Sequence, residues 1–543
     1  MFGRENAVRA RMLVLPSLVV LVLGAASGRA DVVTDWNTIW LDCVRATGGP
    51  PCPIARAGAM VHGAVFDAVN AIDREHEPYL VNFHAPAQCP QEAAAAVAAH
   101  DVLLHLYPQR QAILDQALAA SLAEVPDGRL KRFAINLGKR VARRFIHARR
   151  RDGSDELVPY SPGSGPGEWR PTPPDYSSPA TPNWGNVEPW TMIRGDQFRP
   201  VGPLGFLSLA DLLNSQGYVD QFNEVKDLGA RVSPSRSDYQ TETAFFWAND
   251  VDGTYKPPGH LNHIAQALAE QENLTLSERA RLFALLNITL AEAGLVAWDC
   301  KYFTAIDLWR PIAGIREADA DGNGLTMADP TWDPLNAFTP PFPAYISGHA
   351  TFGAAAAAIF TDFFGTDEIT HTFGTDDPLY TGGPRTYHRF SDAAIENGRS
   401  RIYLGVHWQF DATDGYIAGT ALGDFVYGSI LRPIDSMAAP AEPSITKAAT
   451  ALNTDFVTVV YSPARARATI EYALPAAGSV QIAILDVLGR RVTTLVDARQ
   501  EAGAKAISWT GLGDNGVPVA SGVYFARVVA PGAEQTKKIV IVR

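Results

Sequence analysis

Three short stretches of the chain combine basic, hydroxyl and imidazole side chains. The first covers residues 301–316 and contains Lys301 and Arg310, the second covers residues 340–349 and ends in Ser-Gly-His, and the third covers residues 400–411. Arginines offer forked donors to the oxygens of a tetrahedral anion, and a lysine adds a point charge. The sequence therefore predicts a pocket for a phosphate-like oxyanion.

The second and third stretches also carry two histidines. Ser347 and the main-chain N–H of Gly348 precede an expected helix, whose N-terminus favours an anion. His349 follows directly, and His407 precedes Asp411 by four residues. Each feature alone has an ordinary explanation, such as an N-cap or a helix-surface pair. Together they match what a trigonal-bipyramidal centre needs, with a histidine at each apical position.

These motifs resemble the vanadium-dependent haloperoxidase and type 2 phosphatidic acid phosphatase superfamily, whose pattern is K-x6-R-P, P-S-G-H and S-R-x5-H-x3-D. The third motif matches at every fixed position from Ser400 to Asp411, and the second differs only by Ile346 in place of proline. The resemblance covers residues 31–435. It implies a helical-bundle catalytic domain that holds vanadate or phosphate.

The resemblance also implies a role for each site residue. His407 would be bonded to the vanadium of vanadate, or would accept phosphate as a nucleophile, and Asp411 would orient it. His349 would be the general acid or base. Phe342 matches a position that is Phe in chloride-oxidising fungal relatives and His in algal bromoperoxidases. The oxygens would be held by Lys301, Arg310, Ser347, Gly348 and Arg401.

The spacing of Lys301 departs from this pattern. Lys301 and Arg310 are nine residues apart, whereas the superfamily places them seven apart. In a regular helix seven steps return to the same face, and nine steps reach nearly the opposite one. Two alternatives follow: a bulge or break restores Lys301 to the pocket, or the site has lost its lysine.

The elements that must position these groups are predicted to be helical. Helical apolar spacing indicates helices over 55–72, 91–106, 109–123 and 130–149, and later near 207 and over 237–248, 262–270, 276–300, 350–364 and 391–407. Residues 152–199 are rich in Pro, Gly and Ser and read as one long loop. Almost nothing before residue 435 alternates like a strand, so we expect an all-α body. His260 and His263 are expected at its surface.

The C-terminal part of the chain differs from the rest in composition and in the pattern of its apolar residues. Residues 436–455 are predicted to be a linker, and residues 456–543 contain short alternating runs separated by turn signals, which favour a small β-sandwich. This part resembles the sorting domains of the type IX secretion system and the immunoglobulin-like module of flagellar hook-capping proteins. A simple adhesion or spacer sandwich is the alternative.

Residues 1–30 are typical of a secretory signal peptide, with a basic head, a short apolar run and a small-residue exit. No later segment has an apolar run long enough to span a bilayer. A formal net charge of −12 argues against a broad nucleic-acid-binding face, although one concentrated basic pocket stays compatible with it. We therefore expect a protein that is secreted or held at the cell surface, in which Cys43 and Cys52 could pair.

The leading hypothesis is an exported haloperoxidase-like enzyme that uses vanadate as cofactor and takes peroxide and halide as substrates. The alternative is an acid phosphatase that hydrolyses phosphate esters through a phospho-histidine at His407 and needs no cofactor. A degenerate enzyme domain on a surface binding protein is less favoured, because the second and third motifs are nearly complete. In each case the C-terminal domain would meet the secretion machinery.

Overall fold

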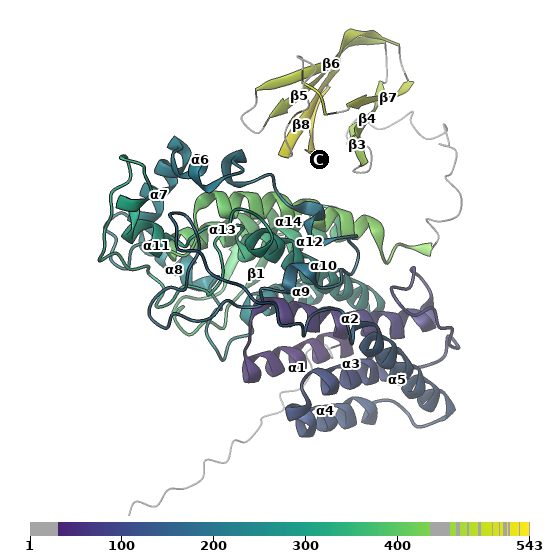
Figure 1. The fold of residues 1–543 in the computed structure, drawn as a ribbon. Helices are drawn as coiled ribbons and strands as arrows, with labels where there is room; N and C mark the ends of the chain where they lie inside the picture. Colours follow the sequence, from purple (N-terminus) through teal and green to yellow (C-terminus); the bar gives the residue numbers. More distant parts are fainter. Residues whose placement is uncertain are drawn as a thin grey trace, which may run out of the picture.

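The fold is that of a computed structural model (Figure 1), which describes residues 31–434 and the strands of the C-terminal region. The predicted signal peptide at 1–30 and the linker at 436–455 lie outside the described residues. In the C-terminal region the described residues are 457–462, 467–474, 477–486, 490–501, 503–509, 511–513, 519, 522–530 and 533–541.

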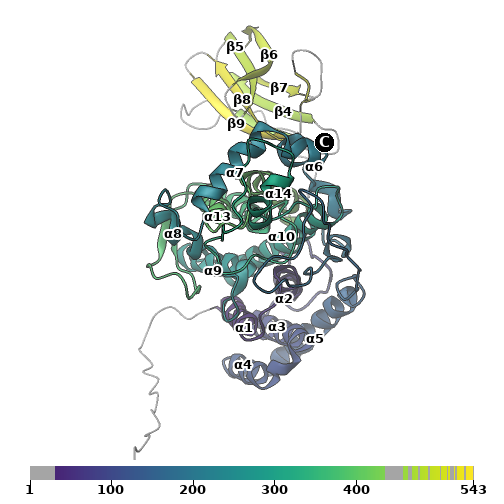
Figure 2. The same cartoon turned by 60° about the vertical axis from the view of Figure 1, so that its left-hand side comes forward.

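The first helices form one end of the helical body, and both ribbon views place them together (Figures 1 and 2). The side chain of Asp31 accepts the main-chain N–H of Val33 and so caps the first helix. The elements are α1 (Val32–Thr47), α2 (Pro51–Asp73), α3 (Gln91–Leu106), η1 (Pro108–Arg110), α4 (Gln111–Ala123) and α5 (Arg129–Arg149).

Helix α10 (Leu276–Tyr302) is the central element of the body. It begins in a reciprocal capping box between Thr275 and Glu278, and every residue from 280 to 301 is buried. It packs against α2 and against α12 (Gly348–Phe364). Within the described residues α10 is the one helix long and apolar enough to cross a membrane, and its most apolar stretch is wholly buried inside the body.

The segment from residue 150 to 208 is irregular, as the sequence predicts, apart from three short 3₁₀ turns. These are η2 (Trp184–Asn186), η3 (Gly195–Phe198) and η4 (Pro203–Gly205). The middle of the body then contains α6 (Leu209–Leu213), α7 (Gln216–Leu228), α8 (Asp238–Phe246), α9 (Lys256–Gln271), α11 (Pro311–Arg316) and η5 (Ala318–Ala320).

The last helices of the body differ from the prediction in one respect. The helix expected over 391–407 ends early, so that α13 (Phe390–Tyr403) and α14 (Gln409–Ser429) are separated by a turn. Gly405 in that turn has a φ of 79°, and a Cβ there would lie 2.4 Å from the carbonyl oxygen of Gly229. Only glycine allows this close approach, and the helix cannot continue through it.

A small hairpin also departs from the all-helical expectation. Strands β1 (His371–Phe373) and β2 (Arg385–Tyr387) pair antiparallel between α12 and α13. The runs are three residues each, too short for an alternating pattern to stand out in the sequence.

The described C-terminal strands form two antiparallel sheets, which confirms the predicted β-sandwich. One sheet has the order β3-β4-β7 and the other β6-β5-β8-β9, and apolar residues of both sheets share one core. The strands are β3 (Val457–Ser462), β4 (Arg467–Leu474), β5 (Gly478–Asp486), β6 (Arg491–Gln500), β7 (Gly503–Trp509), β8 (Gly522–Ala530) and β9 (Ala533–Ile541).

The four cysteines are free thiols buried in the helical body. The pairing of Cys43 with Cys52 that the sequence leaves open is therefore not present in the structure. Cys52 instead points toward the carbonyl oxygen of Gly294, with its sulfur 3.9 Å away. These cysteines behave as small apolar residues of the core.

Candidate active site

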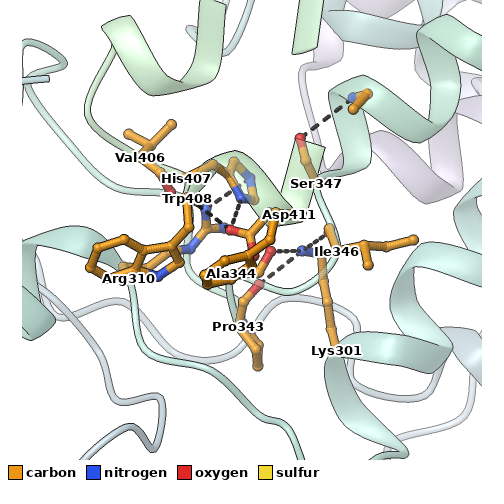
Figure 3. Close-up of polar contacts among 12 residues, drawn as sticks. Lys301, Arg310, Pro343, Ala344, Ile346, Ser347, Val406, His407, Trp408 and Asp411 are labelled. Atoms are coloured by element: carbon orange, nitrogen blue, oxygen red, sulfur yellow. Dashed lines mark hydrogen bonds and ion pairs between the residues drawn. The ribbon is translucent and has the colours of Figure 1, made fainter. Parts of the chain in front are cut away.

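The three predicted stretches meet in the interior of the helical body (Figure 3). Lys301 lies at the end of α10, Arg310 immediately precedes α11, Ser347 caps α12, and Arg401 lies on α13. The side chains of all four are wholly buried. The turn that Gly405 creates places His407 just before α14, so helix ends supply most of the site.

His407 and Asp411 form a buried pair. The Nδ1 of His407 lies 2.9 Å from Oδ2 of Asp411, which also accepts the main-chain N–H of Trp408 at 3.0 Å. Burial lowers the pKa of His407 well below its usual value, and the charges of Arg310, Lys301 and Arg401 lower it further. The imidazole is thus neutral at pH 7, with its proton on Nδ1 and a lone pair on Nε2.

Arg310 faces that lone pair. Its Nη1 lies 3.0 Å from the Nε2 of His407 and donates to the carbonyl of Val406 at 2.7 Å, while its Nε donates to the carbonyl of Phe342 at 2.8 Å. Its Nη2 is buried and has no hydrogen-bond partner in the described protein. Burial lowers the pKa of Arg310 to about 9, so the guanidinium stays charged at pH 7.

Arg401 is held by a carboxylate that the sequence motifs do not include. Its Nη2 lies 2.7 Å from Oδ2 of Asp250, while its Nε and Nη1 are buried without a partner in the described protein. Burial works against ionisation of Asp250, yet Arg401, His349 and Lys256 hold its pKa below its usual range. Asp250 therefore fixes one end of the guanidinium and leaves the other end facing the site.

Lys301 reaches this region because α10 ends at Tyr302. The residues from 303 to 310 do not continue the helix, so the nine-residue spacing does not place Lys301 on an opposite face. Its Nζ donates to the carbonyls of Pro343, Ala344 and Ile346 at 2.8, 3.0 and 2.6 Å (Figure 3). Because the helix ends there, Lys301 does reach the site. Its three N–H groups, however, bind the main chain that leads into Ser347.

Ser347 and His349 begin α12. The main-chain N–H of Ser347 donates to the carbonyl of Asp411 at 2.9 Å, and its Oγ accepts weakly from Ala350 N at 3.4 Å. The Nε2 of His349 lies 3.1 Å from the carbonyl oxygen of Ala248, so that nitrogen carries the proton and Nδ1 has the lone pair. Burial, with Arg401, lowers the pKa of His349 to about 4.

Phe342 packs at the edge of the site. Its ring lies 4.8 Å from the ring of Trp298, and Arg310 and Lys301 both approach it, with the Cζ of Arg310 4.8 Å and the Nζ of Lys301 5.0 Å from the ring centre. Trp298 and Phe342 thus form an aromatic wall beside the cations. Trp298 lies three residues before Lys301, on the same helical face, which is the signal that could have found it.

The buried donors that lack a hydrogen-bond partner indicate one kind of ligand. Buried polar atoms without partners are rare in proteins, and three guanidinium nitrogens here share that state. Arg310 contacts the neutral imidazole of His407, and Arg401 is near enough for its charge to lower the pKa of that imidazole. A tetrahedral oxyanion would satisfy these donors, so the residues present fit vanadate or phosphate.

Comparison with known proteins agrees with this geometry. Residues 281–436 match the model of the VCPO second helical-bundle domain. This part of the body is a vanadium haloperoxidase-family domain. Residues 458–534 match the FlgD Ig-like domain, in agreement with the C-terminal sheets.

The likeness to vanadium haloperoxidases extends beyond residues 281–436. The chain is 29% identical over 488 residues to the vanadium chloroperoxidase of Curvularia inaequalis, which covers 69% of this chain and 78% of that protein. The fold resembles a bacterial vanadium-dependent iodoperoxidase with a TM-score of 0.64, at 24% identity and covering 76% of this chain and 99% of that one. It also resembles a holo-type bacterial vanadium-dependent chloroperoxidase with a TM-score of 0.56, at 18% identity and covering 71% and 93%.

Two residues near the candidate site lie outside the sequence motifs. Asp250 lies between α8 and α9, far from every motif, and no spacing links it to Arg401. His260 was expected at the surface and is instead buried, with Nδ1 2.9 Å from Asn249 Nδ2 and Nε2 3.0 Å from the carbonyl oxygen of Gly374. That expectation was wrong because α9 packs into the body and begins at Lys256, several residues before the predicted start.

Proposed function

We propose that this protein is a vanadate-dependent haloperoxidase that oxidises halide with hydrogen peroxide. The observation that carries the proposal is the set of three buried guanidinium nitrogens without a partner on Arg310 and Arg401, together with the contact between Arg310 and the lone pair of His407. A family-level likeness to vanadium haloperoxidases supports it.

Each site residue would have a distinct role in this activity. His407 would bind through Nε2, with Asp411 holding the proton on Nδ1 and so fixing the tautomer. Arg310, Arg401, Ser347 and the main-chain N–H of Gly348 would hold the oxygens. When bound, vanadate supplies the Lewis acid that activates peroxide toward halide.

His349 would be the general acid or base of the reaction. Its Nδ1 is unprotonated at neutral pH, because its pKa is lowered to about 4 and Nε2 donates to Ala248. It can therefore accept a proton from an incoming hydroxyl group or peroxide and return it later. Trp298 and Phe342 would line the approach of the halide with apolar surface.

Lys301 would act through the main chain. Its three hydrogen bonds to residues 343–346 fix the loop that presents Ser347 and Gly348. The charge also lies close enough to lower the pKa of His407. Lys301 is thus a positioning residue that also contributes positive potential.

A phosphatase is the second candidate function, and one observation favours it. The unprotonated Nε2 of His407, oriented by Asp411, is also the arrangement of a nucleophile that accepts phosphate. Vanadate would then inhibit instead of activate.

The experiment follows both activities on one preparation. The full chain is freed of phosphate and metal and assayed with and without orthovanadate for bromide and iodide oxidation by peroxide, and for phosphate monoester hydrolysis. We expect halide oxidation only with vanadate, its loss in His407→Ala, and full activity in His388→Ala, which changes an exposed histidine. Ester hydrolysis that vanadate inhibits would make the protein a phosphatase, and the absence of both activities would contradict both candidates.

We also propose that the protein is exported, with residues 1–30 as signal peptide and residues 456–543 as a type IX sorting domain. The basic residues and the short apolar run of residues 1–30 support the first part, and the Ig-like match over residues 458–534 supports the second. In a host with a type IX system, removal of either segment should keep the protein in the cell. Unchanged export without residues 456–543 would contradict the sorting role.

A further inference from the structure

Helix α5 carries an unusual concentration of positive charge. Residues 129–151 contain ten of the chain's 46 lysines and arginines and not one aspartate or glutamate, in a protein whose net charge is −12. Both ribbon views place α5 at one end of the helical body, away from α7 and α13 (Figures 1 and 2). This charge therefore has no part in the site around His407.

Most of these side chains share one face of the helix. With about 100° per residue, the exposed cations fall within an arc of about 140°, and their span is about 27 Å along the axis. We call this surface the α5 cationic face. Its members are Arg132, Lys139, Arg140, Arg143, Arg144 and Arg150.

The opposite face of α5 is anchored in the body. Leu137, Val141 and Phe145 are buried, and α5 packs against α3 and α2. The apolar side is thus used inside the protein except in its first turn, where Leu130 and Phe133 are exposed. This argues against insertion of α5 into a bilayer, for which an amphipathic helix needs a free apolar face.

The cations of this face are largely left without a carboxylate partner by the protein, although the charge of Arg132 helps to lower the pKa of Asp127. Arg132, Lys139, Arg143, Arg144 and Arg150 form no side-chain hydrogen bond or ion pair within the described residues, and all of them are exposed. Arg140 stacks over the ring of Phe83 at 4.1 Å, and together with Arg143, Arg144 and His147 it surrounds a shallow hollow. A band of exposed cations about 27 Å long matches a linear polyanion better than a single small anion.

We propose that the α5 cationic face binds a sulfated polysaccharide. Five of its six cations are arginines, whose planar forks bind the oxygens of a tetrahedral oxyanion in pairs. Nucleic acid shares the oxyanion chemistry, but proteins that bind single strands add a row of aromatic platforms. On this face the described residues expose the rings of Phe133 and His147, which lie about 21 Å apart along the helix axis and so form no continuous row, and the ring of Phe83 is covered by Arg140.

The test uses dextran sulfate, with carboxymethyl dextran and neutral dextran as matched polymers on the same backbone. We expect the full chain to bind dextran sulfate at 50 mM salt, to bind the carboxylated polymer at least tenfold more weakly, and to ignore the neutral one. Because binding releases counterions, the affinity should fall steeply with added salt. A lack of binding to dextran sulfate would overturn the proposal.

Two triple variants locate the binding. Arg140→Gln, Arg143→Gln and Arg144→Gln together should lower the affinity at least tenfold and flatten its salt dependence. The matched control removes the same charge elsewhere, through Arg194→Gln, Arg231→Gln and Arg389→Gln, which lie at other exposed sites. An equal loss in both variants would mean that net charge alone attracts the polymer and would overturn the assignment to α5.

Two further ligands decide the class of partner. Single-stranded DNA of equal charge, or vesicles with an anionic lipid, that bound as tightly as dextran sulfate and lost affinity in the α5 variant would overturn the choice of a sulfated polysaccharide. Vanadate-dependent activity should be equal in both triple variants, since neither touches the site. A failed haloperoxidase assay would therefore leave this result unaffected.

Discussion

The protein holds two groups of cations in opposite circumstances. Lys301, Arg310 and Arg401 have no exposed surface, whereas the arginines of the α5 cationic face lie in water. In both places guanidinium nitrogens lack protein partners. In the interior such an atom costs free energy until a ligand meets it, whereas at the surface water satisfies it at once. A missing partner therefore indicates a ligand directly in the core, and at the surface only the pattern of several cations does.

The strongest test of the buried group removes Arg401. Arg401→Ala deletes two of the three partnerless nitrogens, and each charge-assisted hydrogen bond is worth about 1.5–3 kcal/mol. We expect the affinity for vanadate and for phosphate, measured by calorimetry, to fall at least about 100-fold, since 1.4 kcal/mol is tenfold. The affinity of Arg401→Lys should lie between that of Arg401→Ala and that of the wild type. Arg389→Ala, which changes an exposed arginine, should match the wild type. An affinity within twofold of the wild type in Arg401→Ala would mean that these donors do not hold the anion.

A second test leaves Arg401 in place and removes its counterion. Asp250→Asn should lower the free energy of unfolding in urea by about 2–3 kcal/mol, because a buried cation loses its charge partner. This loss of unfolding free energy is small for a broken buried ion pair because the Asp250 side chain is 15% exposed. Asp252→Asn, at an exposed carboxylate two residues away, should change it by less than about 0.5 kcal/mol.

Added anion sharpens the same test. Phosphate or vanadate should stabilise Asp250→Asn more than the wild type, since the bound anion replaces the missing negative charge. Equal stabilisation of the two proteins would show that Asp250 and the anion do not share Arg401.

The third test uses pH and His349. Burial lowers its folded pKa to about 4, below the usual value of 6.5, so the unfolded chain takes up the proton first. The stabilisation is present above pH 6.5 and is lost as the pH falls toward 4. Between pH 7 and 4.5 the wild type should therefore lose about 2 kcal/mol more than His349→Gln.

Urea unfolding at both pH values measures this difference. The exposed His388→Gln serves as the matched control, and it should follow the wild type. Identical pH dependence in His349→Gln and the wild type would mean that His349 is not a buried neutral imidazole.

The smallest effect is expected on α5. The triple glutamine variant at Arg140, Arg143 and Arg144 should unfold within about 1 kcal/mol of the wild type, because exposed cations without ion pairs contribute little to stability. A larger loss, seen in the same urea titration, would show that these side chains stabilise the helix and would remove the contrast with the buried group.

The sequence predicts the helical body, the C-terminal sandwich and the site segments well, for identifiable reasons. Apolar spacing identifies long helices such as α2 and α10, and the motif from Ser400 to Asp411 needs only local spacing to bring His407 and Asp411 together. Each of these rests on residues close in the chain, where helical geometry sets the contact.

What the sequence leaves open depends on contacts between distant segments. Asp250 meets Arg401 across 151 residues, and the early end of α13 depends on Gly405 meeting Gly229. The helical phase argument about Lys301 fails because α10 ends at Tyr302, so the angle between Lys301 and Arg310 is set by the irregular segment that follows. Such features follow from packing, which a periodic pattern does not contain.

The three hydrogen bonds of Lys301 have a consequence for local opening. An ammonium in the dry interior cannot lose one carbonyl at a time without a growing cost, so residues 343–346 and the end of α10 should open together. In native-state hydrogen exchange, the amides of this segment and those of the last turn of α10 are then expected to exchange as one cooperative unit, with a single opening free energy. The loop that leads into Ser347 would share the stability of the central helix instead of moving as a surface loop.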